Sequence, residues 1–305
     1  MMDIWRTGFV RATLAQVLAE GSLEPFKVQW LPDTESRFAF LADPFGVVRG
    51  GMLYVFVEVL DYGQRRGRIE VLTYDSEMVL RDRSTCLAEP WHLSYPVPIK
   101  WRGEDFLLPE AHRSGGLTLY RATRFPDQWE RAARIELPQV PVDATPFWHD
   151  GLWWLFYSVA GDETGQLQVA FGEELTGPFQ AHPANPVRTG LAGSRPAGRP
   201  VQIGAEIILP VQDRSRTYGG AVRPLHIHCL TPDGFEAELG TAIEAPPGFA
   251  PYNDGIHTLS ECGPITLFDV KRIDRSLAGQ VVGLIGKVRR RAGRSRMRFP
   301  GADPG

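Results

Sequence analysis

Ten polar residues recur along the chain at similar intervals. Five of them begin short segments, at separations of 52, 48, 52 and 59 residues: Asp43, Tyr95, Asp143, Arg195 and Asp254. Five more end the same segments, 15 residues later or 17 in the fourth: Glu58, Glu110, Ser158, Gln212 and Asp269. Carboxyl groups dominate both sets, so the first question is what chemistry they could perform together.

Carboxyl groups that converge in one site shift one another's pKa values, because like charges in a partly desolvated site cannot all ionise. That is the requirement for a general acid beside a general base or nucleophile at neutral pH. Cleavage of a glycosidic bond uses such a pair, about 5–5.5 Å apart for retention and about 6.5–9.5 Å apart for inversion. The residue types therefore indicate acid–base chemistry on a carbohydrate, although any single acid could equally cap a strand or pair with an arginine.

The five segments also share an internal pattern that predicts the fold. Each has a short apolar run, a turn with glycine eight or nine residues in, and a second apolar run, which is typical of a hairpin of two buried strands. Residues 67–74 and 116–121 fit further outer strands. Four antiparallel strands repeated about every 50 residues are typical of propeller blades. We therefore predict an all-β fold, a five-bladed β-propeller, because a β-sandwich would not explain the recurring polar ends.

In a propeller the innermost strand of each blade runs along the central channel, and the second strand returns beside it. The opening residues would thus form one ring at a rim of the channel, with His257 slightly deeper, and the closing residues a second ring. Aromatic side chains expected near this rim would suit stacking on sugar faces: Tyr62, Trp91, Tyr95, Tyr218 and Tyr252.

The two ends of the chain differ from its body. Apolar residues at helical spacing, from Phe9 to Leu18 and ending at Gly21, predict a short helix within an N-terminal helical segment, residues 1–25. The propeller is expected over residues 26–278, with residues 26–31 adding an outer strand to the last blade. Residues 279–305 form a basic C-terminal tail.

Charge is distributed unevenly. The 305 residues have a formal net charge of −3, and residues 279–305 carry seven basic residues and one acid, so residues 1–278 carry −9. An apolar stretch, 281–285, precedes the basic run. Two interpretations stay open: a solvated tail, which is the simpler one, or weak contact of residues 287–298 with an anionic membrane.

Composition disfavours several classes of function. The acidic body and the shortness of the basic clusters argue against nucleic acid. Cys86, Cys229 and Cys262 lie far apart without metal-type spacing, which predicts free thiols in a reducing compartment. His226 and His228 fit the polar face of an outer strand, so we expect no metal and no cofactor. No apolar run reaches the roughly 18 residues of a membrane span, and no apolar signal region opens the chain, so a cytoplasmic location is expected.

Several stretches resemble known families of five-bladed propellers. The opening at Asp43 and residues 175–179 and 182–187 resemble the arabinanase, β-xylosidase and invertase/levanase glycosidases. Further stretches resemble the propeller domain at the N-terminus of glucosamine inositolphosphorylceramide transferases and its bacterial relatives: 92–96, 108–112, 185–187, 195–200, 212–213, 218–219 and 254–258. The resemblance covers roughly residues 25–275 and implies the propeller fold and a carbohydrate ligand.

The resemblance also implies roles for individual positions. Asp43 matches the aspartate that acts as base or nucleophile in the propeller glycosidases. Asp143 opens the third blade, where arabinanase-type enzymes place a general acid that is normally glutamate. The second blade, where those families have a pKa-tuning aspartate, begins here with Tyr95 and leaves Glu110 or His92 as substitutes.

Two functions follow from these assignments. The first is a carbohydrate-active, glycoside hydrolase-like enzyme acting on an intracellular glycan or glycoconjugate, with Asp43 as base or nucleophile and Asp143 or Glu110 as acid. The residues expected to bind its substrate are Glu58, His92, Tyr95, Arg195, Gln212, Asp213, Asp254 and His257. The second is a non-catalytic propeller that binds a glycan or scaffolds a glycosyltransferase, which the missing aspartate of the second blade favours.

Overall fold

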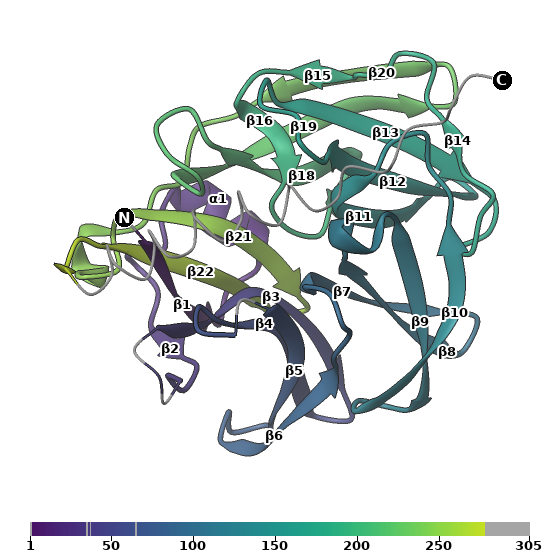
Figure 1. Cartoon of the computed structure of the whole chain (residues 1–305). Coiled ribbons are helices and arrows are strands. Elements are labelled where there is room, and N and C mark those ends of the chain that lie inside the picture. The colour runs from purple at the N-terminus through teal and green to yellow at the C-terminus, as the bar shows by residue number, and fades with distance from the viewer. Residues whose placement is uncertain (1, 35, 37, 65, 278–305) are drawn as a thin grey trace, which may run out of the picture.

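The computed structural model describes residues 2–277 except residues 35, 37 and 65. Five antiparallel sheets are arranged around a common axis (Figure 1), and each sheet is one blade. The predicted five-bladed β-propeller is confirmed. The basic tail, including residues 287–298, lies outside the described residues.

The blades follow one another in chain order from the first to the fifth. The strands of the first two blades, from the channel outward, are β3 (Ala39–Arg49), β4 (Met52–Asp61), β5 (Arg66–Tyr74), β6 (Leu80–Leu87), then β7 (Ser94–Trp101), β8 (Glu104–Glu110), β9 (Leu117–Arg124), β10 (Gln128–Ile135). Those of the third blade are β11 (Pro141–His149), β12 (Leu152–Val159) and β13 (Gln166–Gly172), with an outer edge divided into β14 (Gln180–Ala181) and β15 (Arg188–Thr189).

The inner strand of the fourth blade is divided as well, into β16 (Ala192–Pro196) and β17 (Val201–Ile203). Its other strands are β18 (Glu206–Asp213), β19 (Ala221–Thr231) and β20 (Gly234–Leu239). The fifth blade consists of β21 (Gly255–Cys262), β22 (Ile265–Asp274), β1 (Met2–Val10) and β2 (Val28–Trp30). The first strand of the chain therefore pairs with the last strand that the structure describes.

A glycine with positive φ closes the inner hairpin of every blade, where a side chain would be strained. These glycines are the ones that the repeat pattern predicted: Gly51 (76°), Gly103 (86°), Gly151 (78°), Gly204 (65°) and Gly263 (59°). The repeat thus correctly placed the five inner hairpins.

The N-terminus differs from the prediction of a helical segment over residues 1–25. Met2–Val10 form β1, which pairs with β22 along its full length, and residues 28–30 pair outside β1 as the expected outer strand. Phe9 and Val10, assigned to the helix by their spacing, end this strand instead. The propeller therefore begins at Met2 and not at residue 26, because the partner of β1 lies at the far end of the chain.

The predicted helix is present but shorter. Helix α1 (Leu14–Glu20) begins at a capping box, in which Thr13 and Gln16 satisfy each other's backbone N–H groups, and ends at Gly21 in the left-handed conformation. Its buried residues Leu14 and Val17 pack between the fourth and fifth blades. The helix thus covers the junction between the fourth blade and the fifth, which is the blade that closes the ring.

The core consists of apolar clusters between neighbouring blades. Along β4, alternate residues face opposite neighbours: Val55 and Val57 pack against the fifth blade, whereas Phe56 packs against the second. In the same way, Trp153 of β12 packs against the second blade and Trp154 packs against the fourth. Because each strand is buried on both faces, its apolar run is continuous and not alternating, as the sequence shows.

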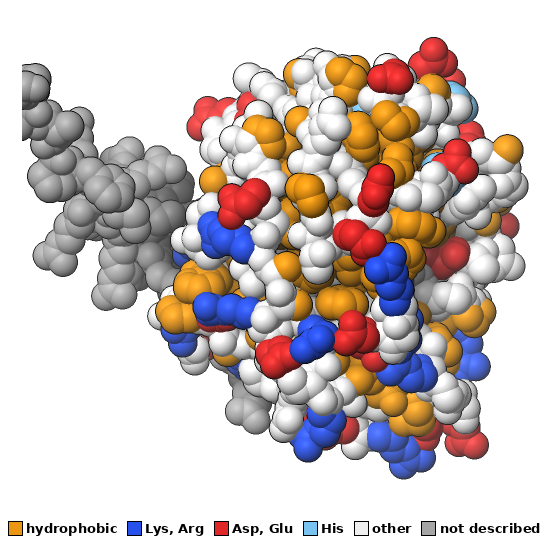
Figure 2. Space-filling model, turned by 90° about the vertical axis from the view of Figure 1, so that its right-hand side faces the viewer, with side chains coloured by type: hydrophobic (Ala, Val, Ile, Leu, Met, Phe, Trp, Pro, Cys, Tyr) orange, Lys and Arg blue, Asp and Glu red, His pale blue; other side chains and the backbone are white. Residues whose placement is uncertain are grey.

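The outer strands carry charged side chains of both signs. Figure 2 shows them interspersed among apolar ones on the side where β9 and β10 lie. Arg121 pairs there with Glu130 at 2.6 Å and Arg131 with Glu89 at 2.7 Å. Within the described residues, no helix is both long and apolar enough to cross a membrane.

Candidate functional site

Three innermost strands carry a bulge at the residue that opens the repeat. Asp43, Tyr95 and Asp143 have φ values of 50°, 46° and 52° and lie at register shifts of β3, β7 and β11. Register shifts in the other two innermost strands contain Arg195 and His257. Bulges and positive φ re-aim side chains and are frequent at functional sites. Five blades thus direct one residue each at the channel, and in the fifth blade it is His257 and not Asp254.

A pocket of about 420 Å³ opens at this end of the channel. Seven of the eleven predicted site residues line it: Asp43, Glu58, His92, Glu110, Asp143, Arg195 and His257. The pocket is rich in acids and lies where the rings were predicted.

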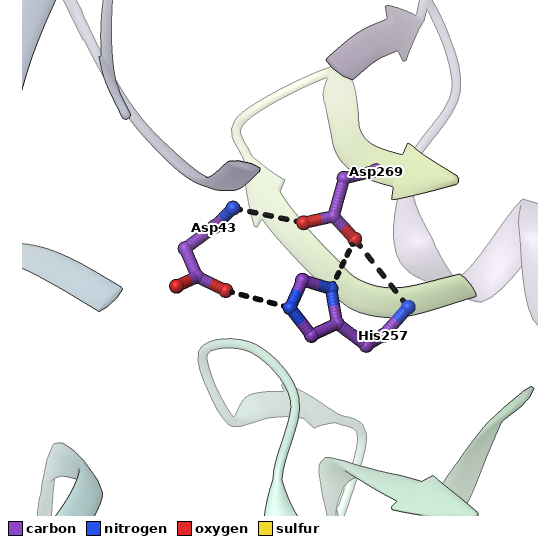
Figure 3. A group of neighbouring side chains, drawn as sticks. All are labelled: Asp43, His257 and Asp269. Atoms are coloured by element: carbon purple, nitrogen blue, oxygen red, sulfur yellow. Dashed lines mark hydrogen bonds and ion pairs between the residues drawn. The ribbon is translucent and has the colours of Figure 1, made fainter. Parts of the chain in front are cut away.

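Asp43, His257 and Asp269 form a buried chain of charges at one side of the pocket (Figure 3). His257 Nε2 lies 3.2 Å from Asp43 Oδ1, and its Nδ1 lies 2.6 Å from Asp269 Oδ1. Asp269 also accepts from the backbone N–H groups of Asp43 (2.8 Å) and Thr258 (3.0 Å). The imidazole is therefore held between two carboxyls, with both ring nitrogens engaged.

The electrostatics of this chain follow from burial and from the crowding of acids. Burial raises the pKa of Asp43 to about 7; His257 opposes the rise, and Asp269 and Asp143 add to it. Burial also raises the pKa of Glu58 well above its usual value, as do the nearby Asp43 and Glu110. For His257, burial lowers the pKa, but Asp269 and Asp43 outweigh it and the pKa is raised. At neutral pH the pocket thus holds a carboxyl poised between its two protonation states.

Asp143 occupies the opposite side, paired with a cation. Arg195 Nε lies 2.5 Å from Asp143 Oδ2, and Gln212 Nε2 donates to the same oxygen at 3.3 Å. The Arg195 guanidinium also lies 5.3 Å from the ring centroid of Tyr218. The Asp143 carboxylate therefore already has an ion-pair and hydrogen-bond partner inside the protein.

The second blade contributes two histidines with different roles. His92 Nδ1 accepts from the Gly67 N–H at 2.8 Å, and its Nε2 lies 3.3 Å from Glu58 Oε1. Burial, with Arg113 and His112 nearby, lowers the pKa of His92 to about 4, so it is neutral at pH 7. His112 lines the pocket and is held by Glu110, which bonds its Nδ1 and accepts from its backbone N–H at 2.6 Å.

The other four predicted residues lie away from the pocket lining. Tyr95 is buried below it, where its hydroxyl bonds Thr145 Oγ1 at 3.0 Å and accepts from Gly198 N–H at 2.8 Å. Gln212 is buried behind Asp143. Asp213 accepts from Ser215, and Asp254 accepts from the Ile273 N–H at 2.7 Å.

Three residues that line the pocket were not predicted from the sequence. Trp5, on β1, stacks on His257, and Asp3 and His112 also line the pocket. Behind them Lys271 is fully buried and bonds Asp3 Oδ2 at 3.0 Å, Thr217 Oγ1 at 3.3 Å and the Tyr218 carbonyl. A lysine predicted near the end of a strand gives no local signal of burial, since its partners come from distant segments.

Asp43, His257 and Asp269 are also the one group, among the described residues, whose ligand atoms lie close enough to hold a metal ion, within 4.8 Å of one another. In the present arrangement each imidazole nitrogen faces a carboxylate, so a protonated His257 satisfies the same geometry. The absence of a metal stays a prediction.

The sequence profile described as "Glucosamine inositolphosphorylceramide transferase 1, N-terminal" matches residues 28–249. Curated relatives named glucosamine inositolphosphorylceramide transferase 1 include one from Oryza sativa subsp. indica, 32% identical over 67% of this chain, and one from Arabidopsis thaliana, 30% identical over 81%. The chain spans only 28% and 32% of the length of these relatives.

Solved structures share the fold at low sequence identity. Zg3597, a family 117 glycoside hydrolase from Zobellia galactanivorans, has a TM-score of 0.57 and 15% identity, covering 79% of this chain and 88% of its own. The α-L-arabinofuranosidase PaAbf62A from Podospora anserina, solved with cellotriose, has a TM-score of 0.56 and 11% identity, covering 80% and 94%. This similarity shows the propeller architecture.

Proposed function

Since the chain belongs to the family of the N-terminal domain of glucosamine inositolphosphorylceramide transferase 1, we propose that it is a carbohydrate-active protein that cleaves or transfers a glycosyl group of a glycoconjugate. The observation that carries the proposal is the state of Asp43. A carboxyl with a pKa of about 7 that opens on an acid-rich pocket suits a general base near neutral pH.

Asp43 has the support that a base needs. His257 and the Tyr95 N–H hold its two carboxyl oxygens, at 3.2 and 3.1 Å, which fixes the orientation of the carboxyl. Ionised Asp43 would take the proton of an attacking water or acceptor hydroxyl as that oxygen bonds to the anomeric carbon.

The second proton-transfer group in this proposal is the pair formed by Glu110 and His112. Glu110 holds His112 through Nδ1, which leaves Nε2 as the ring nitrogen able to exchange a proton with a ligand. A protonated His112 would give its proton to the leaving oxygen as the glycosidic bond breaks. Asp143 would bind and orient the sugar and not donate a proton, since Arg195 stabilises its charge.

The names of the relatives suggest the kind of ligand. They refer to glucosamine and inositolphosphorylceramide, so a glycan joined to a phosphorylated polyol is the substrate class we propose for this chain.

A non-catalytic, glycan-binding propeller is the second candidate. It is favoured by two specific features: the third-blade acid Asp143 is already paired, and the second blade presents the buried Tyr95 where related folds would need an acid. Such a domain would hold a glycan for a glycosyltransferase.

Two measurements on the full chain separate the candidates. A glycan array identifies a ligand, and release of reducing sugar from that ligand measures turnover for the wild type and for Asp43→Asn. Turnover in the wild type that is lost in Asp43→Asn, with binding retained, supports the enzyme. Binding without turnover supports the second candidate, and a chain that binds no glycan overturns both.

A further inference from the structure

A second pocket, of about 170 Å³, lies beside the first. The two share Trp5 and Phe40 in their linings, so they stand on either side of one wall. The second pocket lies between β1 of the fifth blade and the start of β3 in the first, where the ring closes. Its chemistry differs from that of the acid-rich first pocket.

Two arginines line the second pocket, Arg6 on β1 and Arg272 on β22. Ile4 pairs directly with Arg272 in the sheet, and because side chains alternate along a strand, Arg6 and Arg272 lie on the same face as diagonal neighbours. The backbone therefore places two guanidinium groups on one side of the fifth blade.

Aromatic rings hold both guanidinium groups in place. The Arg6 and Arg272 groups lie 5.6 and 5.7 Å from the ring centroid of Tyr252, and Arg6 also lies 4.7 Å from that of Trp30. Cation–π contacts restrict the groups but leave their N–H donors unused. The arrangement is thus preorganised for an acceptor that brings several oxygens.

The positive charge of the second pocket is only partly balanced. Asp33 Oδ1 lies 3.5 Å from Arg6 Nε, on a side chain that is 68% exposed, and Arg6 Nε is buried and donates no hydrogen bond. Among the residues that the structure describes, Arg272 has no acid within ion-pair distance. Among the described residues that line the pocket, two cations, one exposed acid and an unused buried donor point to an anionic ligand.

We propose that the second pocket binds a phosphoryl group, and that a ligand carrying a sugar in the first pocket places its phosphoryl group here. Guanidinium groups bind phosphate oxygens through paired charge-assisted hydrogen bonds. An acidic pocket for the sugar and a basic pocket for the phosphate, on either side of Trp5 and Phe40, fit one bipartite ligand. The phosphoryl group belongs either to a soluble sugar phosphate or to a lipid headgroup.

Calorimetric titration of the full chain with inorganic phosphate, glucosaminyl inositol phosphate and glucosamine, at fixed ionic strength, tests the proposal. Glucosaminyl inositol phosphate should bind more tightly than phosphate or glucosamine alone, and Arg272→Gln should weaken phosphate binding by about tenfold without affecting the binding of glucosamine in the first pocket. Arg124→Gln, which removes a cation from the outer end of β9, is the matched control and should change nothing.

A second arm distinguishes the two sources of phosphate. Sedimentation with phosphatidylinositol vesicles, against phosphatidylcholine vesicles, reports a headgroup if Arg272→Gln abolishes the difference. Equal phosphate affinity of the wild type and Arg272→Gln would overturn the proposal, as would an equal loss in Arg124→Gln. Neither result depends on turnover, so the proposed function is tested separately.

Discussion

Trp5 of β1 stacks on His257 of β21, with ring centroids 3.7 Å apart and planes at 18°. The two residues come from opposite ends of the chain, so the strand that closes the ring also covers the most buried charges of the pocket. The indole shields His257 while Asp43 and Asp269 hold its two nitrogens. The strand that closes the propeller therefore also completes the wall of the site.

The first prediction concerns this stack. Trp5 is 5% exposed, and its replacement by alanine should lower the free energy of unfolding by about 3–5 kcal/mol, because a large cavity opens and water reaches the buried charges. Denaturant unfolding followed by circular dichroism measures this loss.

Trp5→Phe keeps a ring against His257 and should recover part of the loss. Trp148→Ala, at a tryptophan that is 40% exposed on the third blade, is the control for the loss of an indole as such. If Trp5→Ala were no more destabilising than Trp148→Ala, the stack would contribute nothing to closure.

The sequence predicted the first three blades well because their repeats share one local cause. Asp43, Tyr95 and Asp143 each stand at a bulge of the inner strand, with a glycine turn at a constant distance. Hydrophobic runs and turn glycines are local signals, so the strands, the rim and most of the pocket followed from spacing alone.

The fifth blade was predicted less well because it depends on contacts between distant segments. The repeat spacing predicted that Asp254 opens the fifth blade at the channel. The bulge that directs a side chain at the channel lies instead at His257. The strand Met2–Val10 pairs with the other end of the chain, and nothing in its own residues indicates that. Trp5 and Lys271 were missed for the same reason.

The second prediction is that Asp43→Asn does not destabilise the protein and stabilises it at alkaline pH. An acid whose pKa is about 7 when folded and 3.8 as a free group favours the folded state when protonated. Its contribution to stability therefore falls as the pH rises from about 4 to 7 and stays low above 7. Asparagine cannot ionise and tolerates the positive φ of this position.

Thermal unfolding at pH 5 and pH 8 checks this sign. The melting temperature of Asp43→Asn should exceed that of the wild type by several degrees at pH 8 and by less at pH 5, where only part of the contribution of Asp43 has been lost. A variant that loses stability more at pH 8 than at pH 5 would mean that ionised Asp43 stabilises the fold through His257.

The third prediction uses His92, whose pKa is shifted in the opposite direction. Its folded pKa of about 4 lies below the usual 6.5, so its contribution to stability is complete above pH 6.5 and is lost as the pH falls toward 4. In His92→Gln the amide can still accept from the Gly67 N–H but cannot titrate.

Unfolding free energies measured from pH 7 to pH 4 should therefore fall less steeply for His92→Gln than for the wild type. His149→Gln, at a half-buried histidine of the third blade, is the control for the replacement of an imidazole as such. Parallel curves for His92→Gln and the wild type would show that His92 is not buried in its neutral form.

The fourth prediction concerns His112, which the proposed function makes the proton donor. His112→Gln should reduce turnover by about 10²–10⁴-fold while the affinity for the glycan changes little, because glutamine keeps a hydrogen bond to Glu110 but transfers no proton. A variant that loses affinity and keeps its rate would assign His112 to binding alone.

The fifth prediction concerns the floor of the pocket, where Tyr95 and Gly198 meet. The Tyr95 hydroxyl accepts from the Gly198 N–H at 2.8 Å, and a side chain on Gly198 would place its Cβ 1.8 Å from the Leu259 carbonyl. Tyr95→Phe removes the acceptor from a buried N–H and should cost about 1–3 kcal/mol in unfolding free energy. Gly198→Ala should cost more, since the backbone of Leu259 must move and the Leu259 N–H bonds the adjacent Ala197 carbonyl at 2.7 Å, which links the fourth blade to the fifth. Gly248→Ala, whose added carbon would meet nothing nearer than Glu24 Oε1 at 3.5 Å, is the control and should be nearly neutral. Equal stability of Gly198→Ala and Gly248→Ala in denaturant unfolding would show that Gly198 and the Leu259 carbonyl do not close the channel at the floor of the pocket.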